Sequence, residues 1–243
     1  MTAQLSSVSA VLPACNDGGT IASMVLLVLD TLAQVTTDCE VIVVDDGSRD
    51  YTPAILEMLC ARHPVLRVIT HAENRGYGAA LRAGFGAATK EWIFYTYGDA
   101  QYDARELLLL APAAATADIV NGYKIARHDP LYRIVLGRAY HLLVSTLFAL
   151  PVRDVDCDFR LFRRALLERV QLTSVSGTIA LELVFKFQRC GARFAEVPVH
   201  HYHRVYGRSQ FFNLRWVGRT IRQLLALWLQ LVVRGSARPP DSP

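Results

Sequence analysis

Several features that would place this chain in a common class are missing from its sequence. Its 243 residues contain five cysteines, an odd number, and no Cys-x-x-Cys pair of the kind found in zinc or redox sites. No segment reaches the roughly 20 uninterrupted apolar residues of a membrane-spanning helix. The first nine residues lack the basic and apolar regions of a signal peptide. We therefore expect a protein of the reducing cytoplasm without a spanning anchor.

Motifs of two large ligand-binding classes are also missing. The first expected strand is followed by Ala-Cys-Asn-Asp-Gly-Gly at 14–19 instead of Gly-x-Gly-x-x-Gly, which argues against a dinucleotide-dependent oxidoreductase. No zinc-finger, helix-turn-helix or RNA-binding signature appears, so we expect no nucleic-acid partner.

Charge is distributed unevenly along a chain that is otherwise typical of a folded domain. Hydrophobic residues make up 52% and charged residues 20%, which is enough apolar surface for a core. Residues 1–123 hold 7 Lys/Arg and 14 Asp/Glu, whereas residues 124–243 hold 19 and 8. The basic C-terminal half is expected to meet an anion, either phosphates or an anionic lipid surface.

Apolar strands and amphipathic helices alternate along the first half. Strands are expected at 8–14, 40–44, 65–70, 92–97 and 118–121, and helices at 20–32, 53–62, 78–88 and 104–116. This order predicts an α/β fold with a mostly parallel sheet flanked by helices, and ligands at the carboxyl ends of its strands. Polar clusters at 15–19, 45–50 and 97–103 would meet there. The alternative is that they are ordinary polar turns.

Two of these loops carry the residue types of a nucleotide site. Asp45 and Asp46 are suited to hydrogen bonds from a base imide and ribose hydroxyls, although an Asp-Asp-Gly-Ser sequence also suits a tight turn. Asp99 and Gln101 stand two residues apart, and their oxygens suit a divalent ion bridging a diphosphate. Mg²⁺ and Mn²⁺ are the ions that prefer such ligands.

Taken together, the order of motifs resembles family 2 glycosyltransferases of the GT-A fold, and within them the dolichyl- and polyprenyl-phosphate sugar synthases. The resemblance covers about residues 8 to 215. The segments that carry it are Leu-Pro-Ala-Cys-Asn-Asp at 12–17, Val-Asp-Asp-Gly-Ser at 44–48, Asn-Arg-Gly-Tyr-Gly at 74–78, Gly-Asp-Ala-Gln at 98–101, the segment 154–164, Glu-Val-Pro-Val at 196–199, and Arg204 with Gly-Arg-Ser at 207–209.

The resemblance implies site residues of three kinds. Those expected to bind the nucleotide-sugar are Pro13, Cys15, Asp17, Asp45, Asp46, Arg75, Gly76 and Asp99. Those expected to hold Mg²⁺ or Mn²⁺ are Asp99 and Gln101. Those expected to bind the acceptor phosphate are Arg160, Arg204, Arg208 and Ser209, and the catalytic group is Asp99, Arg160 and Arg204.

Four positions depart from the resembled pattern. Tyr97 stands where the first acid of Asp-x-Asp is usual, which weakens the metal site or abolishes its metal dependence. Cys15 stands where Tyr is usual and Asp17 where Glu is usual, so the choice of donor is expected to differ. Asp158 replaces a Gly in the acceptor segment, and we expect it to point to solvent because a carboxylate would repel a lipid phosphate.

The resemblance implies an inverting, metal-dependent hexosyltransferase that moves a sugar from a UDP- or GDP-linked donor to a polyprenyl or dolichyl phosphate. A phosphate acceptor is largely dianionic at neutral pH and needs no general base. A soluble or protein hydroxyl acceptor would need one, with Asp156 and Asp158 the nearby candidates. A non-catalytic nucleotide-sugar-binding partner subunit is the alternative of another class, because Tyr97 weakens the metal site.

Two further sets of polar side chains have several candidate roles. His200, His201 and His203 lie at the end of an expected strand, so His201 and His203 would share a face and serve as phosphate partners or metal ligands. Glu182, on an expected helix, would orient the acceptor-side arginines, or would occupy a solvated face or an ion pair.

The organisation expected from these patterns is a glycosyltransferase domain at 1–210, with nucleotide-sugar binding at 8–123 and an acceptor side at 124–210. Residues 211–233 form a predicted amphipathic interfacial helix, in which Arg215, Arg219 and Arg222 make a basic stripe. This helix would associate peripherally with the cytoplasmic face of the cell membrane, or would pack on the protein's own core or a partner chain. The Pro- and Ser-rich stretch 234–243 is expected to be a disordered tail. A homo-oligomer or a membrane-protein partner is left open.

Overall fold

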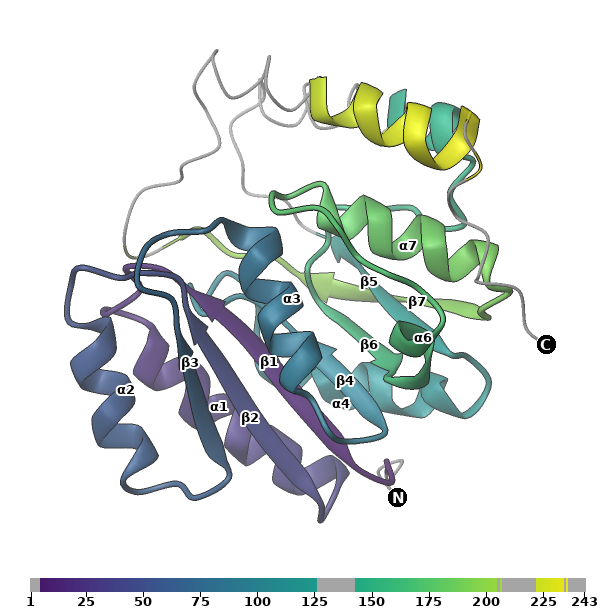
Figure 1. Cartoon of the computed structure of the whole chain (residues 1–243). Coiled ribbons are helices and arrows are strands. Elements are labelled where there is room, and N and C mark those ends of the chain that lie inside the picture. The colour runs from purple at the N-terminus through teal and green to yellow at the C-terminus, as the bar shows by residue number, and fades with distance from the viewer. Residues whose placement is uncertain (1–4, 126–142, 205, 207–221, 234, 236–243) are drawn as a thin grey trace.

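A seven-stranded sheet with helices on both faces forms the body of the protein (Figure 1). The computed structural model describes residues 5–125, 143–204, 206, 222–233 and 235. The strands are β1 (Val8–Ala14), β2 (Cys39–Asp45), β3 (Leu66–Thr70), β4 (Trp92–Tyr95), β5 (Ile119–Ile125), β6 (Arg160–Arg163) and β7 (Phe194–His200). The helices include α1 (Ile21–Val35), α2 (Thr52–Cys60), α3 (Tyr77–Ala87), α4 (Leu107–Leu110), α6 (Ala165–Glu168) and α7 (Ile179–Arg189). Residues 143–148 and 222–228 are also helical, and Leu229–Val233 forms a π-helical turn.

The sheet has the order β3-β2-β1-β4-β6-β5-β7. Strands β1 to β4 pair in parallel, as do β5 and β7, whereas β6 lies antiparallel between β4 and β5. Every residue of β1 is buried, as expected for a parallel strand covered on both faces. The predicted mostly parallel α/β fold is confirmed.

Helices cover the two faces of the sheet with separate apolar clusters. On one face, α1, α2 and α4 pack on the sheet, and α1 does so through buried residues at helical spacing. On the other face lie α3, α6 and α7. The expected helix 104–116 is instead a short α4 between two 3₁₀ turns, Ala104–Glu106 and Ala111–Ala115. Pro112 accounts for the break because it lacks a backbone N–H.

An outer helical layer, residues 143–148 and 222–233, covers α7 (Figure 1). Leu224, Leu227 and Leu231 are buried in the same apolar cluster as α7, and the Trp228 indole donates to the Leu147 carbonyl at 3.1 Å. The alternative that this C-terminal segment packs on the protein's own core therefore holds for its inner face. No helix in the described ranges is both long and apolar enough to cross a bilayer.

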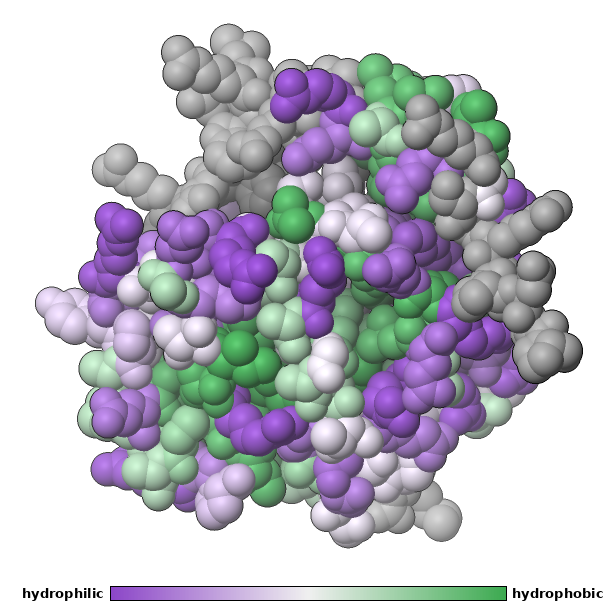
Figure 2. Space-filling model, in the orientation of Figure 1, coloured by the Kyte–Doolittle hydropathy of each residue, from purple (hydrophilic) through white to green (hydrophobic). Residues whose placement is uncertain are grey.

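The outer face of the same C-terminal helix carries a stripe of exposed, mainly apolar side chains. Their spacing of three and four residues places them on one side, and they are Arg222, Leu225, Ala226, Leu229, Val232 and Val233. Figure 2 shows apolar surface over this helix. Arg215 and Arg219, the other members of the predicted basic stripe, lie outside the described residues, as does most of the predicted tail 234–243.

Burial of α7 corrects the surface position expected for Glu182. The side chain is fully buried, since α7 is enclosed between the sheet and the outer helical layer. Its carboxylate accepts hydrogen bonds from the backbone N–H groups of Thr173 and Ser174 and pairs with Lys186 at 2.5 Å. The ion-pair alternative is confirmed. Glu182 thereby fixes the loop before α7.

Candidate functional site

The loops that follow β1, β2 and β4 meet at the carboxyl edge of the sheet. The Asn16 N–H donates to the Ser48 hydroxyl at 2.9 Å, and the Arg49 N–H donates back to Asn16 Oδ1 at 2.8 Å. The Thr20 hydroxyl donates to the Gly98 carbonyl at 2.9 Å. These bonds join the three predicted polar clusters, so the loops are parts of one site.

Asp46 holds the loop 74–76 in place through hydrogen bonds to its backbone. Its carboxylate accepts from the His71 ring at 2.6 Å and from the backbone N–H groups of Arg75 and Gly76 at 2.9 and 2.8 Å. Asp45 Oδ1 accepts from the Ser48 N–H at 3.0 Å. Both acids are buried, and Asp46 is the one that contacts Arg75 and Gly76. Their contact with a nucleoside stays a prediction.

Two glycines are required by this arrangement. Gly47 and Gly76 have φ angles of +71° and +96°, a region that favours glycine. A Cβ on Gly76 would also lie 2.5 Å from the Val175 carbonyl oxygen. The loop 74–76 therefore approaches the segment before α7 closely, which joins the N-terminal half of the chain to the C-terminal half.

Cys15 and Asp17 lie on the loop after β1, which follows the buried Pro13. The Cys15 thiol accepts from Asn74 Nδ2 at 3.2 Å, and burial raises the pKa of this thiol. Asp17 Oδ2 accepts from the Cys15 N–H at 3.0 Å, whereas the buried Oδ1 has no hydrogen-bond partner in the described chain. Burial, helped by the charge of Asp99, raises the pKa of Asp17 to about 6. Asp17 is thus a buried carboxyl group at the site with one oxygen that lacks a hydrogen-bond partner among the described residues.

Asp99 is the centre of the loop after β4. Its Oδ1 accepts from the Gln101 N–H at 3.0 Å, and its Oδ2 pairs with Arg204 Nη2 at 2.6 Å. The Gln101 amide donates to the Tyr202 carbonyl at 3.2 Å, and the Tyr202 N–H donates to the Gln101 carbonyl at 2.8 Å. These two hydrogen bonds anchor the segment after β7 on the loop after β4 and bring Arg204 to Asp99.

The residues present suit a divalent cation only when other ligands complete its coordination. No group of three or more His, Cys, Asp or Glu side chains in the part of the chain that is described could hold a metal ion. Asp99 nevertheless offers a buried carboxylate, and Asp17 adds a nearby negative charge with one unbonded oxygen. Phosphate oxygens and water would supply the remaining hard ligands that Mg²⁺ or Mn²⁺ requires.

Arg160 lies away from the phosphate-binding position predicted for it. Its side chain is fully buried, and its guanidinium donates to Asn121 Oδ1, the Tyr95 hydroxyl and the Val155 carbonyl. All three nitrogens are engaged inside the sheet, so no face is left for a phosphate. The correction follows from the pairing of Arg160 with Tyr95 across β6 and β4. Arg160 orders the acceptor segment from within.

Asp158 is likewise buried instead of pointing to solvent. Its side chain is 5% exposed and lies beside the Tyr97 and Tyr77 hydroxyls. Burial raises the pKa of Asp158, whereas the solvent-exposed position expected for it would have favoured the ionised carboxylate. Arg208 and Ser209 fall outside the described residues, so their predicted contacts with the acceptor phosphate stay predictions.

The histidine cluster does not form the predicted strand face. β7 ends at His200, whose ring pairs with Glu106 at 2.5 Å and whose N–H donates to the same carboxylate at 2.8 Å. His201 and His203 lie beyond the strand, and the His201 ring packs on Tyr102. The Glu106 contact ends the strand and turns the chain toward the metal loop.

Three residues of the site were not predicted. His71 supports Asp46, and its position directly after an expected strand was a signal for it. Asp50 accepts from the Gly18 and Thr52 N–H groups at 3.0 Å, and thereby fixes the loop after β1. The Tyr206 ring lies against Gly19, a contact between distant segments that had no signal in the sequence.

Comparison with known proteins gives matches over most of the chain. A model of glycosyl transferase family 2 matches residues 9–171. An undecaprenyl-phosphate 4-deoxy-4-formamido-L-arabinose transferase of Yersinia pestis is 27% identical over 88% of this chain, which spans 65% of that relative. Glycosyltransferase AglD of Haloferax volcanii is 32% identical over 96% of this chain and 39% of its own length.

Solved structures share the fold. A glucosyl-3-phosphoglycerate synthase from Mycobacterium tuberculosis, in complex with Mn²⁺, UDP-glucose and phosphoglyceric acid, matches with a TM-score of 0.72 at 20% identity, over 98% of this chain and 82% of that one. The same synthase with Mg²⁺ and UDP matches with a TM-score of 0.67 at 20% identity, over 98% and 81%. The sheet and its flanking helices therefore have the arrangement predicted as GT-A-like.

Proposed function

This chain belongs to glycosyl transferase family 2, and on that premise we propose that it is an inverting glycosyltransferase that moves a sugar from a UDP- or GDP-linked donor to a polyprenyl or dolichyl phosphate. One observation carries the proposal: three acid-bearing loops at the carboxyl edge of the sheet are joined to each other, and Arg204 reaches into them to pair with Asp99. The buried acids of this site suit a divalent cation, and the long basic side chain of Arg204 suits the diphosphate that the cation would accompany.

The donor half would bind the nucleotide-sugar along the loops after β1, β2 and β4. Asp45, Asp17 and the loop 74–76 are placed to line the nucleoside, and Asp99 with Gln101 would hold Mg²⁺ or Mn²⁺. When bound, the metal supplies positive charge that stabilises the departing diphosphate. The relatives named as undecaprenyl-phosphate transferases, and the neighbours solved with Mn²⁺ and UDP, support this assignment.

Transfer to a phosphate acceptor fits the side chains around the site. An acceptor phosphate oxygen forms the bond to the anomeric carbon as the bond to the diphosphate breaks, and the configuration inverts. The acceptor is already largely ionised at neutral pH, so no general base is needed. Asp158, one of the two bases considered for a hydroxyl acceptor, is buried beside Tyr77 and Tyr97, which leaves Asp156 as the candidate base for that alternative.

Arg204 would change partners during binding. In the structure it neutralises Asp99, and its side chain remains 27% exposed. A cation on Asp99 would replace this charge and release the guanidinium, which would then pair with a phosphate through two parallel hydrogen bonds. Arg204 would then lie between donor and acceptor, the role proposed for it from the resemblance.

We also propose that the outer stripe of the C-terminal helix rests on an anionic membrane surface, on the cytoplasmic side. Leu225, Leu229, Val232 and Val233 are exposed on the side away from the core, and Arg222 extends the same stripe. An apolar face of this kind suits an interface, and the net basic charge of residues 124–243 suits anionic lipid. The five cysteines are free thiols, in keeping with a reducing compartment.

Ligand-dependent stabilisation, followed by turnover, tests the proposed function. The purified full chain is heated with UDP, GDP, UDP-glucose or GDP-mannose, with and without Mn²⁺, because a ligand of the folded state raises the melting temperature. We expect one nucleotide series to stabilise the chain more in the presence of Mn²⁺. Transfer is then measured with radiolabelled donor and undecaprenyl phosphate, and with a soluble sugar acceptor as the control.

The outcomes separate the alternatives. Binding of the nucleotide-sugar without transfer to any acceptor would favour the non-catalytic binding subunit. That alternative was raised by Tyr97, which stands where the first acid of Asp-x-Asp is usual. Transfer to the soluble acceptor alone would favour the hydroxyl-acceptor enzyme. No stabilisation by any nucleotide would contradict the donor site itself.

A further inference from the structure

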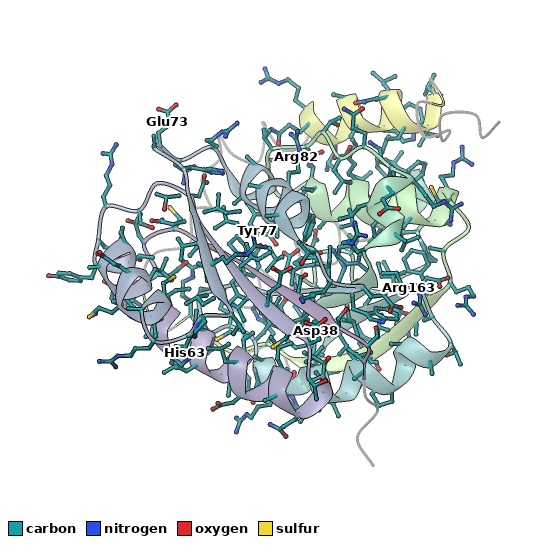
Figure 3. The ribbon with its side chains drawn as sticks, turned by 60° about the horizontal axis from the view of Figure 1, so that its bottom comes forward. Asp38, His63, Glu73, Tyr77, Arg82 and Arg163 are labelled. Atoms are coloured by element: carbon teal, nitrogen blue, oxygen red, sulfur yellow. The ribbon has the colours of Figure 1, made fainter. Side chains whose placement is uncertain are left out.

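Tyr77, Tyr97 and Asp158 form a buried polar cluster beside the metal loop. In the antiparallel pair of β4 and β6, Tyr95 lies opposite Arg160, and continuing this register by two residues sets Tyr97 opposite Asp158. The Tyr97 ring stacks on Tyr77, the first residue of α3, with ring centroids 4.9 Å apart. Figure 3 shows Tyr77 between the start of α3 and the sheet. Tyr97 is two residues before Asp99, so the cluster adjoins the site.

Two polar atoms of this cluster have no hydrogen-bond partner among the described residues. They are the Tyr77 hydroxyl and Asp158 Oδ1, and both are buried. Buried polar atoms are almost always bonded. These two lie beside each other, and neither makes a well-directed hydrogen bond within the cluster, so each has capacity for a further partner. Tyr97 is within hydrogen-bonding reach of the same Asp158 carboxyl and is itself partly exposed.

The chemistry of the cluster selects its ligand. A phenol donates a hydrogen bond and a carboxyl group accepts one, so a hydroxyl group, which does both, satisfies the two together. A phosphate is disfavoured, because Asp158 would repel it when ionised. The pKa of Asp158 is raised by burial while Arg160 opposes the rise, so the group serves as an acceptor when ionised and also as a donor when protonated.

We propose that Tyr77, Tyr97 and Asp158 bind a hydroxyl group of the donor's sugar and determine which sugar is accepted. The proposal rests on the proposed donor site, since a metal held by Asp99 and Gln101 would keep the diphosphate next to this cluster. A site built to bond a hydroxyl discriminates strongly against a sugar that lacks it, because the buried partners are then left unbonded. It also gives a role to two positions, 97 and 158, at which the chain departs from the pattern it resembles.

The test compares the affinity for a nucleotide with the affinity for the same nucleotide carrying its sugar. Calorimetry with Mn²⁺ gives Kd for UDP and UDP-glucose, and for GDP and GDP-mannose, with wild type, Tyr77→Phe and Asp158→Asn. Tyr51→Phe, which removes an exposed hydroxyl at the start of α2, is the control. Circular dichroism melts establish that each variant is folded.

We expect both variants to bind the bare nucleotide within twofold of wild type and the nucleotide-sugar about tenfold more weakly, as for the loss of one buried hydrogen bond. Deoxy-sugar nucleotides then identify the hydroxyl, because the penalty of Tyr77→Phe vanishes for the donor that lacks it. Equal weakening of nucleotide and nucleotide-sugar, or no weakening of either, would overturn the sugar site alone. Failure of wild type to bind any of the four nucleotides would overturn the proposed function and this inference with it.

Discussion

Arg204 and Asp99 form an ion pair at the point where a cation is expected. Arg204 Nη2 lies 2.6 Å from Asp99 Oδ2, and the Asp99 carboxylate is only 2% exposed. A divalent ion on this carboxylate and the guanidinium would compete for the same oxygen. Arg204 neutralises the Asp99 carboxylate in the structure, and we predict that a metal bound here would release the guanidinium.

Substitution on either side of this pair should move Mn²⁺ affinity in opposite directions. Asp99→Asn should remove measurable binding of Mn²⁺ and most transfer activity, because the two positions expected to hold the metal, 99 and 101, would then offer only neutral side-chain oxygens. Arg204→Gln should tighten Mn²⁺ binding by about fivefold, since a competing charge is removed. Paramagnetic resonance of free Mn²⁺, with UDP or GDP present, measures both. Unaltered Mn²⁺ affinity in Arg204→Gln would contradict the competition.

Tyr97→Asp should destabilise the chain instead of simply strengthening the metal site. The new carboxylate would face buried Asp158, and two buried acids in contact repel each other. The double variant Tyr97→Asp/Asp158→Gly removes the repulsion and restores the resembled pattern at both positions. We expect it to recover most of the lost melting temperature and to need less Mn²⁺ for half-maximal transfer. Equal stability of the single and double variants would argue against the contact.

Arg160→Lys should lower the free energy of unfolding by about 3 kcal/mol, because one ammonium group cannot bond the three acceptors that the buried guanidinium serves. Urea denaturation followed by circular dichroism measures the change. Arg105→Lys is the control, as Arg105 is exposed and its pairing with Asp103 is on the surface. A stability loss confined to Arg160→Lys supports its structural role. If Arg160→Lys kept wild-type stability but bound the acceptor weakly, the original prediction that Arg160 contacts the acceptor phosphate would hold.

Stability at low pH should depend on Asp118. The Arg193 guanidinium, with a smaller contribution from Arg163, lowers the pKa of Asp118 to about 2, against about 3.9 in an unfolded chain. The resulting stabilisation is present above about pH 4 and is lost as the pH falls toward 2. We expect Asp118→Asn to be about 1 kcal/mol less stable than wild type at pH 6, a value reduced for the exposure of Arg193.

The difference for Asp118→Asn should shrink between pH 5 and pH 2, which urea titrations at each pH would measure. Arg193→Met should give the same trend, because it removes the same pair from the other side. A difference that is constant with pH would assign the effect to packing.

Membrane binding should depend on the outer stripe and not on the inner face of the C-terminal helix. Leu225→Glu/Leu229→Glu should abolish flotation with vesicles that contain anionic lipid, since both side chains are exposed. Leu26→Glu, at an exposed leucine of α1, is the matched control. Binding of wild type should weaken with added salt, as the electrostatic part is screened. Flotation of the double variant equal to that of wild type would contradict the interface.

The sequence by itself determined the fold class and the position of the donor loops. Runs such as Val8–Ala14 and Cys39–Asp45 are mainly apolar, without the strict alternation of a half-exposed strand, which is typical of strands covered on both faces. A helix between two successive strands lets them run parallel, so their carboxyl ends lie at the same edge of the sheet. The joining of loops 15–19, 45–50 and 97–103 follows from this local information.

Only the tertiary structure decided where Asp158, Arg160 and the faces of the C-terminal helix lie. β6 inserts antiparallel between β4 and β5, and its pairing with β4 joins segments more than 60 residues apart along the chain, which no local pattern encodes. This pairing buries Asp158 against Tyr97 and Arg160 against Tyr95. Leu224 and Leu225 are both leucine, yet one is buried and the other exposed. Apolar periodicity finds the helix, but its orientation is set by the layer beneath it, because a helix that is apolar on two sides buries whichever side meets the core.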